Sequence, residues 1–127
     1  MSLRSPLGRV LGLGSAKEGV HHWWLQRVTS VALVPLTVWF VASLLALPAV
    51  DHTAVVAWMA QSWTALLLIL FVLVATWHSQ LGLRVVVEDY VHGGLKTVLL
   101  VIISFTHTVI AAAGIFAILK VAFGAAP

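Results

Sequence analysis

The stretch that decides the fold runs from Thr53 to Leu83 and reads TAVVAWMAQSWTALLLILFVLVATWHSQLGL. It contains no Asp, Glu, Lys or Arg. A helix needs about 20 apolar residues to cross the hydrocarbon core of a bilayer, and this run exceeds that length. The sequence therefore predicts a membrane-spanning helix near 56–83, which carries one ionisable side chain, His78, close to its end.

Two further uncharged runs flank this one, at 28–50 and 97–119, and they predict spanning helices near 26–48 and 96–121. The predicted fold class is all-α: an integral membrane protein with three transmembrane helices. The predicted organisation is an N-terminal tail over 1–25, a three-helix membrane anchor domain over 26–122 and a short C-terminal tail over 123–127.

The composition supports a membrane protein. Of the 127 residues, 61% are hydrophobic and only 9% are charged, whereas a soluble domain carries roughly a quarter charged residues. The net charge of +3 does not indicate nucleic acid as a partner, because the basic residues are scattered singly beside the apolar runs. Cysteine is absent, which excludes disulfides, thiolate zinc sites, iron–sulfur ligation and covalent c-type haem attachment within this chain.

The basic residues also predict the orientation. By the positive-inside rule, the side of the membrane with more Lys and Arg faces the cytoplasm. This places the N-terminus and the 84–96 loop in the cytoplasm and the C-terminus in the periplasm of a bacterial inner membrane, a mitochondrial inner membrane being the less favoured location. The cytoplasmic side holds six of the seven basic residues, and only Lys120 lies on the other: Arg4, Arg9, Lys17, Arg27, Arg84 and Lys96.

His78 is the first candidate for chemistry. An ionisable residue inside a membrane is costly and usually faces the bundle interior, where it binds something or pairs with a neighbour. A neutral imidazole is the commonest metal ligand and a standard axial ligand of haem. Gly82 shares its helix face and could leave room for a flat macrocycle. The alternative is a histidine hydrogen-bonded to a neighbouring helix, with Gly82 as an ordinary packing residue.

His107 lies in the middle of the third predicted helix. It could be a second axial ligand from the same chain, or it could bond a hydroxyl of Ser104, Thr106, Thr108 or a partner helix. Its depth argues against the first reading, because His107 falls about halfway across the membrane and His78 lies nearer the cytoplasmic face. Two axial ligands must approach one iron at the same level.

Asp89 and Tyr90 follow in the predicted cytoplasmic connection. Each alone is common at a membrane surface. Together, below an intramembrane histidine, they could border a lipid-soluble substrate: a phenol donates a hydrogen bond to a carbonyl oxygen, and a carboxylate orients an arginine or relays a proton. A quinone needs such groups because its reduction takes up protons with electrons.

At the same predicted face, GVHHWWLQRVTS (residues 19–30) places His21 and Arg27 at the start of the first helix. Arg27 could simply anchor the helix at the interface beside the aromatic belt of Trp23 and Trp24. Alternatively, His21 and Arg27 could bind an anionic group, such as haem propionates, through charge-assisted hydrogen bonds.

Taken together, GVHHWWLQRVTS, HSQLGLRVVVEDY (residues 78–90) and the three-helix plan resemble the hydrophobic membrane anchor of succinate dehydrogenase, respiratory complex II, in its small D-type subunit. The histidine followed eleven and twelve residues later by an Asp-Tyr pair is the most specific element of the resemblance.

The resemblance implies a subunit of succinate:ubiquinone oxidoreductase without a complete active site of its own. It implies pairing with a second three-helix anchor, the cytochrome b556-type C subunit, and attachment of the flavoprotein and iron–sulfur subunits. His78 corresponds to one axial ligand of a shared haem b, Tyr90 and Asp89 to the ubiquinone site, and Arg27 and His21 to positions near the haem propionates. Two other functions stay open: a self-contained small b-type cytochrome using His78 and His107, and a non-redox membrane scaffold.

Overall fold

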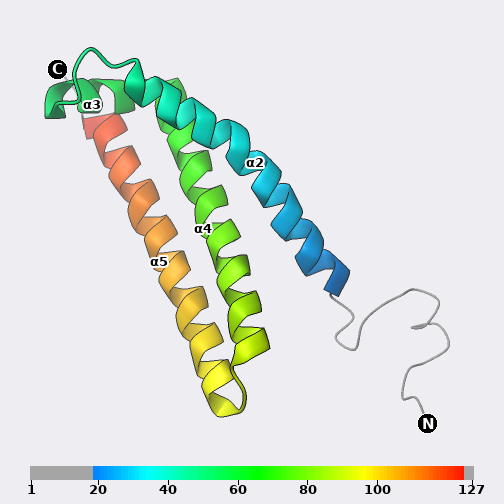
Figure 1. Cartoon of the computed structure of the whole chain (residues 1–127). Coiled ribbons are helices and arrows are strands. Elements are labelled where there is room, and N and C mark those ends of the chain that lie inside the picture. Colours follow the sequence, from blue (N-terminus) through cyan, green and yellow to red (C-terminus); the bar gives the residue numbers. More distant parts are fainter. Residues whose placement is uncertain (1–18, 125–127) are drawn as a thin grey trace, which may run out of the picture.

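The computed structural model describes residues 19–124, and over that range it is entirely helical, with no strand (Figure 1). Three of its helices are long and apolar enough to span a membrane, which confirms the predicted fold class. Residues 1–18 and 125–127 of the predicted tails lie outside the described part of the chain. The four helices are α2 (Gly19–Leu45), α3 (His52–Met59), α4 (Ser62–Tyr90) and α5 (Gly94–Gly124).

The long helices extend beyond their predicted ends. α2 begins at Gly19 rather than near residue 26, and α4 continues to Tyr90 rather than ending near residue 83. Hydropathy reports only the part of a helix that meets hydrocarbon, whereas backbone hydrogen bonding continues until the chain must turn. That turn is made by Gly93, whose φ of 72° lies in the left-handed region that glycine adopts without strain.

The second predicted helix is in fact two. α3 begins after Asp51, whose carboxylate accepts a hydrogen bond from the backbone N–H of Ala54 at 2.8 Å and so caps the helix. The chain then breaks at Gln61, which is extended, before α4 begins at Ser62. Because the apolar run continues through this break, hydropathy alone does not detect it. In Figure 1 the short α3 lies across the ends of α4 and α5.

A small core forms where α3 meets the long helices. Trp58 of α3 is 8% exposed and packs with Ala65, Leu68 and Ile118. Aromatic contacts tie α2 into the same end of the molecule: Phe40 stacks on Phe71 at 5.2 Å and Trp39 on Trp58 at 6.2 Å, measured between ring centroids. This end of the molecule therefore holds all three spans together.

The three spans form an open row. α4 packs against both α2 and α5, while no contact joins α2 to α5 within residues 19–124. Figure 1 shows α2 diverging from α4 toward its own N-terminal end. Against α5, by contrast, α4 packs closely at Gly114, where an added Cβ would lie 3.0 Å from Cγ1 of Val72. Most large apolar side chains of the spans are exposed, so they face lipid or other chains.

Candidate haem and quinone sites

His78 lies on the side of α4 that faces α2. Its Nδ1 is 3.0 Å from Oγ1 of Thr29, and its Nε2 is 3.3 Å from Nε2 of Gln26. Gln26 and Thr29 are three residues apart, so they share one face of α2 and reach the imidazole together. The half-buried histidine is therefore held between two helices, and both its ring nitrogens have neighbours.

The hydrogen bonds around His78 are compatible with a proton on Nδ1. Thr29 is 8% exposed, and its hydroxyl donates to the backbone carbonyl of Leu25 at 2.8 Å. A hydroxyl has only one proton, so when it lies on that carbonyl Thr29 can accept an N–H from Nδ1 of His78. In that tautomer Nε2 keeps its lone pair, 3.3 Å from the amide nitrogen of Gln26. A lone pair on one nitrogen and a fixed hydrogen bond on the other is the arrangement of a metal-ligating histidine.

Nε2 of His78 has the side-chain amide of Gln26 as its hydrogen-bonding neighbour. The contact from Gln26 is long, and Oε1 of the same side chain is enclosed without a partner among the described residues. Gly82 lies one turn beyond His78, and an added Cβ there would meet Nε2 of Gln26 at 3.7 Å. The Gln26 amide makes no other side-chain hydrogen bond among the described residues, so it can move aside for a ligand of His78 without breaking one.

His107 belongs to α5. It lies at nearly the same level as His78 but contacts a different side of α4. Its Nδ1 donates to the carbonyl of Ile103 at 2.7 Å, and its Nε2 lies 3.3 Å from the hydroxyl of Ser79. The expected difference in depth is therefore wrong, because Ser79 is the residue next to His78. The two imidazoles are separated by direction instead: His78 faces α2, and His107, which is 9% exposed, links α5 to α4. The structure does not bring them to one iron.

Asp89 and Tyr90 are the last two residues of α4, not residues of a loop as the sequence predicts. Both are exposed, and 80% of the Tyr90 surface is accessible. Because α4 is continuous from His78, the helical rise separates Tyr90 from it by about 18 Å along the axis. The pair thus stands at the end of the span, open to a partner or a lipid-soluble molecule, with Asp89 on nearly the same face of α4 as His78 and Tyr90 turned about 120° from it.

His21 and Arg27 lie near the start of α2, and both are exposed. The Arg27 guanidinium stacks over the ring of Trp23 at 4.9 Å from its centroid. Arg27 directly follows Gln26, so it stands at the level of His78 but on the outer surface. The neighbouring His22 is half-buried, and its Nε2 is enclosed without a partner in the described part of the chain.

Sequence reasoning missed two neighbours of His78, Gln26 and Thr29. The signal was present as two polar residues at a spacing of three within the first predicted helix, which puts them on one helix face. In the sequence, Arg84 serves only to predict the orientation of the chain in the membrane. It is half-buried, and its Nη2 donates to the hydroxyl of Ser104 at 2.7 Å.

Comparison with known proteins agrees with this arrangement. The model of the family "Succinate dehydrogenase/Fumarate reductase transmembrane subunit" matches residues 1–120. The chain is 36% identical over 92 residues to the succinate dehydrogenase hydrophobic membrane anchor subunit of Rickettsia conorii, covering 71% of this chain and 73% of the relative. It is 35% identical over 115 residues to the subunit of the same name from Paracoccus denitrificans, covering 90% and 88%.

The family match covers residues 1–120 and so spans every segment that holds a candidate residue. The residues expected to act, His78, Asp89 and Tyr90, all lie on one continuous helix of an all-helical, three-span chain. The chain belongs to the succinate dehydrogenase/fumarate reductase transmembrane subunit family, as a membrane anchor subunit of the succinate dehydrogenase type.

Proposed function

We propose that this chain supplies one axial ligand, His78, to a b-type haem and part of a ubiquinone-reduction site in succinate:ubiquinone oxidoreductase. The observation that carries the proposal is the position of His78, half-buried between two spans with Nδ1 3.0 Å from the hydroxyl of Thr29; a proton on Nδ1 would leave Nε2 available to a metal. The second axial ligand comes from a partner chain, because His107 is directed at Ser79.

The chain's own residues bind and orient the haem, which when bound exchanges single electrons. His78 binds through Nε2, and Thr29 holds the ring against rotation. Arg27, at the level of His78, and His21, about 9 Å nearer the start of α2, provide exposed cationic or hydrogen-bonding groups suited to the propionates of the cofactor. Gly82 keeps the adjoining face of α4 free of a side chain.

At the end of α4, Tyr90 and Asp89 border the proposed quinone site. The Tyr90 hydroxyl donates a hydrogen bond to a quinone carbonyl oxygen, which favours the charge that develops there on reduction. Asp89 orients a basic group or relays a proton to the reduced oxygen. The exposure of both side chains suits a site completed by other subunits.

The proposed partners are a cytochrome b556-type C anchor, the iron–sulfur subunit and the flavoprotein subunit. Electrons from succinate pass through the two soluble subunits, since this chain has no cysteine for a cluster. The three spans form an open row, in which α2 and α5 do not pack against each other within the described residues. Helix faces therefore remain exposed that a second anchor can cover. The proposed location is a bacterial inner membrane, with the N-terminus in the cytoplasm.

The test is the reduced-minus-oxidised spectrum of the purified, assembled complex. We expect His78→Ala to remove or shift the b-haem signal and His107→Ala, the matched control, to preserve it. An unchanged spectrum for His78→Ala would disprove the ligand assignment. Haem bound by the chain expressed without a partner, and lost in His107→Ala, would support the self-contained cytochrome instead. Absence of haem from every purified form would support the alternative of a non-redox membrane scaffold.

A further inference from the structure

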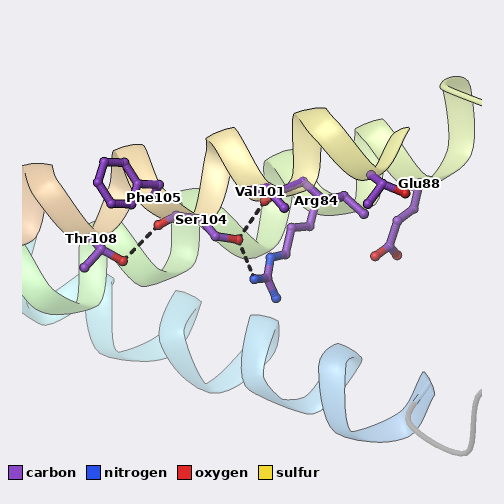
Figure 2. A pocket seen from close by; sticks show the side chains of 8 residues that line it. Arg84, Glu88, Val101, Ser104, Phe105 and Thr108 are labelled. Atoms are coloured by element: carbon purple, nitrogen blue, oxygen red, sulfur yellow. Dashed lines mark hydrogen bonds between the residues drawn. The ribbon is translucent and has the colours of Figure 1, made fainter. Parts of the chain in front are cut away.

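A groove lies between the end of α4 and the start of α5, on a part of the molecule that neither proposed site uses. Its volume is about 610 Å³. Figure 2 shows its side chains in order from the helix ends toward the middle of the spans, and the lining includes an arginine, a carboxylate and three hydroxyls. The labelled residues are Glu88, Arg84, Val101, Ser104, Phe105 and Thr108.

Arg84 holds an uncompensated positive charge in this groove. Its Nη2 donates to the neutral hydroxyl of Ser104 at 2.7 Å, and that hydroxyl donates in turn to the carbonyl of Leu100. Its Nε is enclosed and has no hydrogen-bond partner in the described part of the chain. Within residues 19–124 no carboxylate forms an ion pair with it. A half-buried guanidinium at the end of a membrane span is costly to leave without an anion, so an anionic group bound in the groove would stabilise it.

Glu88 provides a second charge one turn farther along α4. Its carboxylate is exposed and, in Figure 2, lies apart from the Arg84 guanidinium and nearer the helix end. The nearby Lys96 ammonium donates to the backbone carbonyl of Glu88, at 3.0 Å, rather than pairing with its side chain. Arg84 and Glu88 therefore offer a cation and an anion about 6 Å apart along the helix, the cation deeper and the anion nearer the end.

The inner half of the groove is apolar. Val101 and Phe105 are 63% and 70% exposed, and they continue the groove away from the helix end. The hydroxyl of Thr108 is already used, since it donates to the carbonyl of Ser104. From the end inward, the groove thus presents a carboxylate, a guanidinium and then a hydrocarbon wall.

We propose that this groove binds an aminophospholipid of the phosphatidylethanolamine class. The phosphate accepts hydrogen bonds from Arg84, the ammonium pairs with Glu88, and an acyl chain lies along Val101 and Phe105. The order of charges in the headgroup, phosphate inside and ammonium outside, matches the order on α4. A purely anionic lipid would satisfy Arg84 but bring its own charge close to Glu88, which favours the zwitterion.

Native mass spectrometry of the delipidated, assembled complex tests this binding, with dioleoyl phosphatidylethanolamine and dioleoyl phosphatidylglycerol as probes. The wild-type complex should retain phosphatidylethanolamine more tightly. Arg84→Gln should weaken binding of both lipids about tenfold, the effect of losing a charge-assisted hydrogen bond. Glu88→Gln should abolish the preference between them. Lys120→Gln, a cation on α5 far from the groove, is the control and should change neither.

Three results would overturn the proposal. The first is equal lipid retention by wild type and Arg84→Gln, and the second is a wild-type preference for phosphatidylglycerol. The third is a photo-crosslinker at position 101 that captures a subunit of the complex rather than lipid, which would show a protein helix in the groove. If Arg84→Gln fails to assemble, Arg84→Lys replaces it: the charge keeps phosphate binding, but the lost fork geometry weakens it, and unchanged binding there counts against the proposal.

Discussion

The hydroxyl of Thr29 lies 3.0 Å from Nδ1 of His78 and donates its own proton to the carbonyl of Leu25 over 2.8 Å. This relay joins two spans through one imidazole, and by accepting a proton from Nδ1 it would leave the lone pair on Nε2. It makes Thr29 a positioning residue for the proposed haem ligand, although it cannot itself touch the iron through that hydroxyl.

Replacing Thr29 tests the relay. Thr29→Val keeps the shape of the side chain but removes the acceptor, so the ring of His78 can rotate and its tautomer is no longer fixed. We expect haem affinity in the assembled complex to fall roughly 10–100-fold, the usual effect of losing such a partner, and the midpoint potential to shift. Haem content and potentiometric titration measure this. Thr29→Ser restores the hydroxyl and should recover both values, and a valine variant equal to wild type would show that the relay is dispensable.

Gly82 tests the space beside Nε2 of His78. Gly82→Ala adds a methyl group whose nearest neighbour is 3.7 Å away, an ordinary contact, so we expect the complex to assemble normally. Gly82→Leu extends into the proposed haem space and should lower haem per assembled complex without lowering the yield of complex. Gly94→Leu, where nothing lies within 4 Å of an added Cβ, is the matched control. Full haem content in Gly82→Leu would place the macrocycle elsewhere.

Gly114 tests the packing of α4 against α5. An alanine Cβ there would lie 3.0 Å from Val72, a β-branched residue with little rotamer freedom in a helix. We expect Gly114→Ala to lower the free energy of unfolding by about 1–3 kcal/mol, as overpacking does elsewhere. Denaturation in detergent micelles measures the change. Adding Val72→Ala should recover part of it, whereas additive losses in the double variant would contradict a direct clash.

Tyr90 tests the quinone site. Its ring is 80% exposed in this chain, so removing the hydroxyl has little effect on the fold. We expect Tyr90→Phe to lower ubiquinone reduction by roughly tenfold, the effect of losing one hydrogen bond in a site with developing charge. Succinate oxidation with an artificial acceptor should continue unchanged. Equal loss of both activities would indicate an assembly defect and not a quinone contact.

The sequence is sufficient to predict the three spans, because uncharged runs of this length have few other uses in a chain with 9% charged residues. It does not predict the break between α3 and α4, which depends on the Asp51 cap and an extended Gln61 inside an unbroken apolar run. Nor does it predict that α4 continues through Asp89 and Tyr90, since helices extend past the hydrocarbon boundary.

For the site residues, too, some features can be predicted from the sequence and others cannot. The special position of His78 is visible in the sequence because an imidazole in an apolar span is unusual. Its partners are not, because contact between residue 29 and residue 78 depends on the rotation and crossing of two helices. The depth assigned to His107 fails for a related reason: counting residues along a span ignores how far α5 is shifted against α4, and this shift places His107 beside Ser79.

The open row of spans has a consequence for the cellular fate of this chain. Because α2 packs along α4 and meets α3 only at its other end, through Trp39 and Phe40, the half of α2 that carries Gln26 and Thr29 is held from one side alone within the described residues. We expect that region to reach its full stability only in the assembled complex. A copy without a partner exposes the polar side chains on this face of α2 to lipid. Quality-control proteases recognise such faces, and we therefore expect the abundance of the chain to follow the supply of its partner rather than its own rate of synthesis.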